Sequence, residues 1–140
     1  MPKEPSPVNS FITYSLAAAH QRLHRKIGKR LKSLGMQIET WRVLQSLRTD
    51  DTYTMSELAE VVLMNPPALS KLVDRMIADG LVQRQLVPED QRQVRLLLTD
   101  LGVSIANEIT GYVNEQEDRI LDLIGHERAD FLKKALDTLN

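Results

Sequence analysis

One stretch, residues 65–99, constrains the fold more than any other part of the chain. Asn65 can cap the first amides of a helix, and Pro66 takes the first helical position, where an amide would lack a partner. Apolar residues then recur at spacings of three and four, which predicts a helix whose buried side holds Leu69, Leu72, Val73, Met76 and Ile77. Gly80 is a typical helix end. The opposite side carries Pro67, Lys71, Asp74, Arg75 and Ala78. Its mixture of small and cationic residues is what a helix in a DNA groove would present.

A β-hairpin is predicted directly after this helix. Residues 81–87 and 93–98 are β-prone, and Val94, Leu96 and Leu98 recur with period two. The residues between the two runs are polar and end in Arg92. A capped helix followed by a hairpin with a cation near its tip is typical of a winged helix-turn-helix. Such a module places one helix in the major groove and its hairpin against the DNA backbone or the minor groove.

Helical patterns surround this region on both sides. We expect a loose arm, a helix from Val8 or Asn9 to about residue 34, and a second helix over 35–48 with Trp41 facing inward. Tyr53 is expected in a short strand beside the hairpin. Thr54 and Glu57 fit a capping box that opens a short helix, of which the inward residues are Leu58, Ala59, Val62 and Leu63. A long helix from Thr99 to about residue 124 and a last helix after Gly125 complete the chain.

Size and composition narrow the possible functions. The chain has 140 residues, enough for one domain, and has no cysteine, so disulfides and thiolate metal sites are excluded. It has no apolar run long enough for a membrane span and no signal core, so we expect a cytoplasmic protein. Residues 1–48 hold nine Lys or Arg against two acids, whereas residues 49–100 hold five against nine and residues 101–140 four against eight. DNA affinity would therefore depend on a few placed cations.

The segment GLVQR, the segment PEDQRQVRLLLT and the following Gly102 resemble the wing signature of the MarR (multiple antibiotic resistance regulator) family. The segment PPALSKLVDRM resembles that family's recognition helix. The resemblance covers nearly the whole chain and implies a mainly α fold with a small β-wing. Residues 35–99 would form the winged helix-turn-helix. Residues 1–34, an arm and a helix, and residues 100–140 would form a helical dimerisation domain. A homodimer is also expected because an apolar stripe ending at Leu139 is hard to bury within one subunit.

Candidate DNA contacts come from the predicted recognition helix and wing. Lys71 and Arg75 would bind phosphates or read bases, although they could also form a solvated helix face. Pro67, Ala68 and Ser70 could pack on the backbone or on a thymine methyl group. Arg92 would enter the minor groove and Asp90 would orient its guanidinium, as the matching pair commonly does in the family, with Gln91 as a lesser contact. The alternative is an ion pair confined to the turn.

A second group of residues suggests a site for an anionic aromatic effector. His20 and His24 lie one helical turn apart, and Trp41, Arg42 and Arg48 follow on the next predicted helix. Although two histidines at this spacing can chelate zinc, no neighbouring acid completes a set, so we expect no metal site and no cofactor. Each residue also has a purely structural interpretation. For Arg48 this is a favourable interaction with the helix dipole.

These observations predict a homodimeric transcriptional regulator, more often a repressor in the family, that binds a palindromic double-stranded operator. A small molecule would release it, either an aromatic carboxylate or phenolic compound or, alternatively, a coenzyme A thioester. No arrangement of nucleophile and base suggests an enzyme, and no membrane partner is expected. The rival hypothesis is a winged-helix module that binds a protein and no DNA, which the acidic balance of residues 49–100 would allow.

Overall fold

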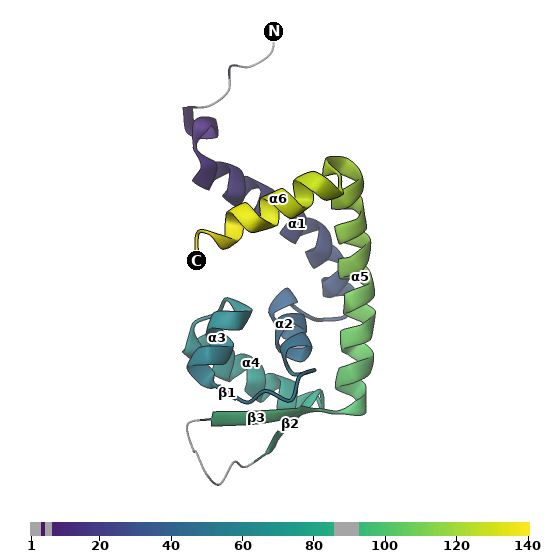
Figure 1. Ribbon diagram of the computed structural model, residues 1–140. Coiled ribbons are helices and arrows are strands. Elements are labelled where there is room, and N and C mark those ends of the chain that lie inside the picture. Colours follow the sequence, from purple (N-terminus) through teal and green to yellow (C-terminus); the bar gives the residue numbers. More distant parts are fainter. Residues whose placement is uncertain (1–3, 5–6, 86–92) are drawn as a thin grey trace. The chain divides into compact units, whose positions relative to one another are not determined.

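The computed structural model describes residue 4 and residues 7–85 and 93–140 (Figure 1). The predicted fold class is confirmed, because the chain is mainly helical with one small antiparallel sheet. Contacts divide it into two compact units, residues 1–37 and residues 38–140, and each is described by itself. No helix in the described ranges is long and apolar enough to cross a membrane.

The N-terminal unit consists of a short 3-10 helix, η1 (Pro7–Ser10), and helix α1 (Ile12–Ser33). Helix α1 begins later than predicted because Phe11 is extended, with φ −92° and ψ 134°. The helix ends at Ser33, close to the predicted residue 34, and Gly35 follows in the left-handed conformation, with φ +67°. Within α1, Ile27 and Leu31 are buried, whereas Ile12 remains 76% exposed.

The second unit contains the winged module and two further helices. Its helices are α2 (Ile38–Ser46), α3 (Met55–Val62), α4 (Pro66–Ala78), α5 (Asp100–Ile124) and α6 (His126–Asp137). Its strands are β1 (Tyr53–Thr54), β2 (Val82–Gln85) and β3 (Gln93–Leu98). In Figure 1, α5 starts where β3 ends, passes α2 and leads into α6.

The sheet has the order β1-β3-β2 and joins the wing to the helix-turn-helix. Strands β2 and β3 form the predicted antiparallel hairpin, with Val82 opposite Leu98 and Gln85 opposite Arg95. Tyr53 pairs with Val94, so the expected short strand beside the wing is confirmed. Because β1 leads directly into α3, this pairing fixes the start of the helix-turn-helix against the wing.

The core of this unit is formed by the apolar sides of its helices and by the base of the hairpin. The fully buried large side chains of the unit are Leu44, Leu58, Leu69, Met76, Leu81, Ile109, Val43, Val62, Val73 and Val82. The residues that the sequence assigned to the buried side of α4 are buried, except that Ile77 is half-buried. Burial of each such side chain contributes roughly 1.5–3 kcal/mol of hydrophobic free energy, so this packing fixes the exposed side of α4.

The predicted inward orientation of Leu63 is wrong. Leu63 is 74% exposed and has a left-handed backbone, with φ +63°. Its amide donates to the carbonyls of Ala59 and Glu60 and thereby ends α3. This change in backbone direction turns its side chain away from the buried side of the helix.

The first turn of helix α5 contacts the base of the hairpin through hydrogen bonds and a close backbone approach. The hydroxyl of Thr99 caps the helix by accepting from the amide of Gly102 at 3.0 Å. The amide of Thr99 donates to the carbonyl of Leu81 at 3.1 Å. Gly102 lies so close to this carbonyl that an added Cβ would be 2.1 Å from its oxygen. The start of α5 is therefore held against the base of the hairpin.

Candidate nucleic-acid interface

The interface is built on the pair of helices α3 and α4. Thr54 and Glu57 form the predicted capping box: the Thr54 hydroxyl accepts from the Glu57 amide at 3.1 Å, and the Glu57 carboxylate accepts from the Thr54 amide at 3.2 Å. Both bonds satisfy amides that would otherwise lack partners at the start of α3. The short turn at Leu63 then joins α3 to α4, which gives a helix-turn-helix.

Helix α4 has the start that its sequence predicts. The side-chain oxygen of Asn65 accepts from the amide of Ala68 at 2.9 Å, and Asn65 itself is extended. Pro66 and Pro67 occupy the first two helical positions, where their missing amides cost little. The helix ends at Ala78, and Gly80 follows two residues later in the left-handed conformation, with φ +75°. Local sequence thus fixes where the candidate recognition helix begins and ends.

The predicted DNA-contact residues of α4 lie together on its exposed side. Pro67, Ser70, Lys71 and Arg75 are exposed, and Ala68 is half-buried. Because Leu69, Leu72 and Val73 hold the opposite side in the core, the cationic side chains project into solvent. This side combines two flexible cations with small residues that allow close approach to a base edge or a backbone.

The wing adds Arg84, which β2 exposes beside α4. Its guanidinium lies 3.8 Å from the carboxylate of Asp74 on α4, and both side chains are more than half exposed. Such a pair contributes well under about 1 kcal/mol to stability, but it connects the wing to the exposed side of α4. The predicted tip residues Asp90, Gln91 and Arg92 lie outside the described residues.

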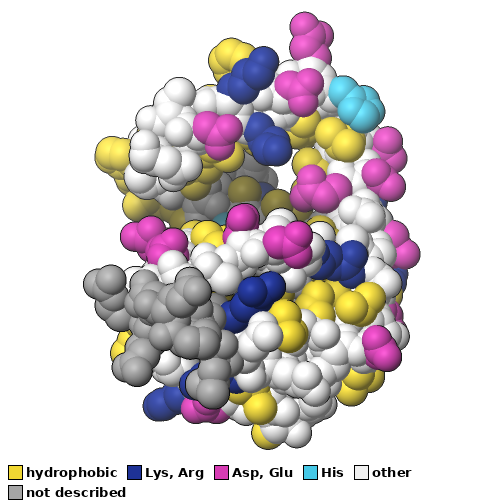
Figure 2. Space-filling view, turned by 60° about the horizontal axis from the view of Figure 1, so that its bottom comes forward, with side chains coloured by type: hydrophobic (Ala, Val, Ile, Leu, Met, Phe, Trp, Pro, Cys, Tyr) yellow, Lys and Arg dark blue, Asp and Glu magenta, His cyan; other side chains and the backbone are white. Residues whose placement is uncertain are grey.

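Charge on this part of the surface is mixed. Figure 2, which brings the lower part of Figure 1 forward, shows Lys or Arg side chains interspersed with Asp and Glu. Among the described residues of α4, Asp74 is exposed between Lys71 and Arg75. Individual cations, rather than a broad positive field, are therefore available for phosphate contact.

Two of the three candidate effector residues of the second unit, Trp41 and Arg48, have hydrogen-bond partners within it. The indole Nε1 of Trp41 donates to the hydroxyl of Thr110 at 2.9 Å, and the guanidinium of Arg48 donates to the side-chain oxygen of Asn107. Trp41 and Arg42 are half-buried, and Arg48 is exposed. Sequence reasoning missed Asn107 and Thr110, although their spacing of three places both on one side of α5.

The two histidines belong to the N-terminal unit. His20 and His24 are exposed on α1, with ring centroids 5.4 Å apart and ring planes inclined by 32°. In the described residues no three side chains of metal-binding type gather in one place. The structure therefore joins Trp41 and Arg48 to neighbouring positions of α5, and it places the two histidine rings beside each other on α1.

Comparison with known proteins identifies the family. A sequence model of the MarR family matches residues 34–93. The HTH-type transcriptional regulator FarR of Neisseria gonorrhoeae is 30% identical over 128 residues, which make up 91% of this chain and 88% of that protein. The chain belongs to the MarR family. It is therefore a transcriptional regulator with a winged-helix DNA-binding fold.

Solved structures of two other proteins agree with this fold over almost the whole chain. NadR in complex with 4-hydroxyphenylacetate has a TM-score of 0.81 at 29% identity, over 99% of this chain and 97% of that one. The transcriptional repressor CouR, bound to a 23-mer DNA duplex, has a TM-score of 0.86 at 23% identity over 99% of both chains, which shows likeness of fold.

Proposed function

We propose that this MarR-family chain is one subunit of a homodimeric repressor that binds a palindromic operator and is released by an anionic aromatic molecule. The exposed side of α4 carries this proposal, because Lys71 and Arg75 project from a helix with a fixed start and a buried opposite side. It is not an enzyme in this proposal, in keeping with relatives that are transcriptional regulators.

Two recognition helices would contact half-sites separated by about one helical turn, roughly 34 Å. On this proposal Pro67, Ala68 and Ser70 approach the groove edge, while Lys71 and Arg75 bind phosphates or bases. Arg92 would bind in the minor groove, with Asp90 orienting it and Gln91 beside it. This arrangement needs few cations per subunit, which suits the mixed charge of the surface.

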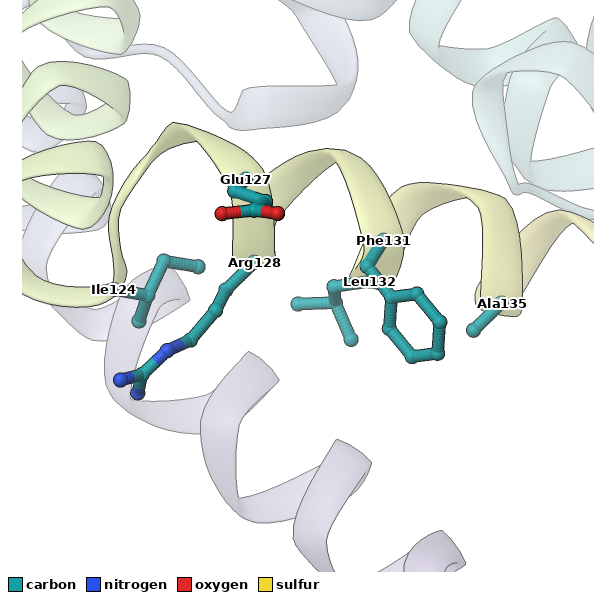
Figure 3. Close-up of a pocket in the computed structure, with 6 residues that line it drawn as sticks. All are labelled: Ile124, Glu127, Arg128, Phe131, Leu132 and Ala135. Atoms are coloured by element: carbon teal, nitrogen blue, oxygen red, sulfur yellow. The ribbon is translucent and has the colours of Figure 1, made fainter.

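Exposed apolar side chains at the end of the chain support the dimer. Ile124, Phe131, Leu132 and Ala135 line a hollow along α6, together with the side chains of Glu127 and Arg128 (Figure 3). Phe131 is 76% exposed and Leu132 is 46% exposed in the single chain. A second copy of the chain would remove this apolar surface from water.

The effector proposal depends on aromatic and cationic side chains. Trp41, Arg42 and Arg48 would bind the ring and the carboxylate of the ligand, with His20 and His24 as further candidates. The NadR structure supports an aromatic acid, because that relative is in complex with 4-hydroxyphenylacetate. The ligand would release DNA only through unequal affinity for the two arrangements of the dimer. The coenzyme A thioester of such an acid is the rival ligand.

DNA binding is tested by titrating an operator duplex from the protein's own promoter region over a series of salt concentrations. The logarithm of the affinity should fall with the logarithm of salt concentration, with a slope near −0.9 per phosphate contact. Lys71→Ala and Arg92→Ala should each weaken binding and make the slope shallower by about one unit for every phosphate that the variant no longer binds. Lys133→Ala on α6 removes the same charge at a position outside the proposed DNA interface. This variant should change neither the affinity for the duplex nor the slope against salt concentration.

The rival function, a winged-helix module that binds a protein and no DNA, predicts a different result. Wild type would then bind the duplex weakly, and Lys71→Ala and Arg92→Ala would behave like Lys133→Ala. That result would refute the DNA-binding assignment of α4 and the wing.

The effector is tested by thermal unfolding with 4-hydroxyphenylacetate and, separately, with its coenzyme A thioester. At a ligand concentration about 100 times the Kd, binding stabilises the fold by about 2.7 kcal/mol, so the unfolding temperature should rise. Arg48→Ala should reduce this rise, and the same ligand should weaken operator binding. No rise with either compound would remove this effector class.

A further inference from the structure

Helix α5 contains two glycines, and packing explains only one of them. A Cβ at Gly102 would lie 2.1 Å from the carbonyl oxygen of Leu81, so no larger residue fits there. A Cβ at Gly111 would meet nothing within 4 Å. Glycine inside a helix costs roughly 0.5–1 kcal/mol relative to alanine, because it loses more backbone entropy. Gly111 therefore weakens α5 without a packing reason.

The part of α5 that precedes Gly111 is fixed to the winged module. Ala106 and Ile109 are fully buried. Asn107 accepts from Arg48, and Thr110 accepts from the indole of Trp41 at 2.9 Å, so two polar contacts join α5 to α2 and the residues that follow it. The second of these contacts ends one residue before Gly111. The part of α5 before the glycine should thus move with the module.

The part of α5 that follows Gly111 has no buried residue. Within α5, all of which the structure describes, the buried residues are Gly102, Ala106 and Ile109. The side chains of residues 111–124 are half-buried or exposed, and Leu123 is 82% exposed. The change from a helix with buried residues to one whose side chains are half-buried or exposed thus coincides with a glycine at which an added Cβ would meet no atom within 4 Å.

We propose that Gly111 is a hinge within α5, and that it determines which operator half-site spacings the dimer accepts. The proposal rests on the dimeric operator binding described above, because the distal part of α5 and α6 would then belong to the dimer interface. The distal part spans about 20 Å at about 1.5 Å per residue. A tilt of about 10° would displace its end by roughly 3–4 Å, close to the rise of one base pair, about 3.4 Å.

The hinge itself can be measured without DNA. The chain has no cysteine, so Glu60→Cys on α3 and Lys133→Cys on α6 give two unique sites for spin labels. Labelled protein is diluted with unlabelled protein, so that pulsed dipolar spectroscopy reports the distance within one chain. Gly111→Ala should narrow the distance distribution and raise the unfolding temperature. Ser104→Ala, in the fixed part of the same helix, should leave the width unchanged.

If the distance distribution were equally wide in Gly111→Ala and in wild type, Gly111 would not be a hinge. A lower unfolding temperature in Gly111→Ala would also contradict the hinge, because it would reveal a packing role for the glycine.

The consequence for specificity is measured with operators whose half-sites are moved one base pair closer together or farther apart. Wild type should bind these altered operators about as tightly as the original one. Gly111→Ala should bind at least one of the two altered operators about tenfold or more weakly, a difference of about 1.4 kcal/mol. Ser104→Ala should match wild type. Equal tolerance in Gly111→Ala and wild type would refute the role in spacing. If wild type binds no operator but Gly111→Ala still narrows the spin-label distance distribution, the hinge proposal is supported and the proposed function is wrong.

Discussion

At residue 102, the backbone of α5 and the carbonyl of Leu81 come so close that only glycine fits. The contact joins the first turn of α5 to the residue that precedes β2, and the Thr99 cap lies beside it. The carbonyl of Leu81 also accepts from the amide of Thr99, so moving it would break a backbone hydrogen bond. A single methyl group at this position therefore disturbs the junction between wing and helix.

We predict that Gly102→Ala lowers the free energy of unfolding by about 1–3 kcal/mol, the usual cost of forcing an extra methyl group into packed structure. The midpoint of urea unfolding measures this loss. Gly111→Ala is the matched control, because the same substitution in the same helix meets no atom within 4 Å and should stabilise. If both variants were equally stable, the close contact at Gly102 would not be energetically important.

Among the elements, α4 depends most visibly on its capping residue. It has two prolines in its first turn, so few amides remain there to be satisfied, and Asn65 accepts from one of them. The cap also fixes the position of Pro67 and Ala68, which we propose as DNA contacts. The Asn65 side chain therefore contributes both to the stability of α4 and to the position of its proposed DNA contacts.

We predict that Asn65→Ala lowers the free energy of unfolding by about 1 kcal/mol, the typical value of a lost N-cap. Asn65→Asp keeps a side-chain acceptor, and should retain most of the stability. Hydrogen exchange of the α4 amides distinguishes a local effect from a global one, because the first turn should lose protection first. Unchanged exchange in Asn65→Ala would contradict a capping role.

Elements that depend on neighbouring residues were predictable from sequence. The caps at Asn65, Thr54 and Thr99 each act within three residues, and the apolar period of α4 is confirmed. The contacts of Arg48 with Asn107 and of Trp41 with Thr110 were not predictable, because the partners are 59 and 69 residues apart.

The orientation of Leu63 was missed for a different reason. A left-handed residue is expected to be glycine, so nothing local indicates the end of α3 there.

At the scale of the whole molecule, the exposed apolar side of α6 bears on whether the chain forms a dimer. Phe131 is 76% exposed and lies among the apolar residues that line the hollow of Figure 3. A charge at this position should cost the isolated chain little, because the side chain is already in water. In a dimer the same charge would be desolvated without a partner. Dimer formation and operator binding should therefore fail together.

We predict that Phe131→Glu shifts the protein from dimer to monomer in analytical ultracentrifugation at micromolar concentration, without changing its circular dichroism spectrum. Because a monomer contacts one half-site, affinity for the full palindrome should fall at least about a hundredfold, or about 2.7 kcal/mol. Lys133→Glu also adds negative charge to α6 but does not line the hollow, so it should remain dimeric. A Phe131→Glu protein that stays dimeric and binds its operator normally would place the subunit interface elsewhere on the chain.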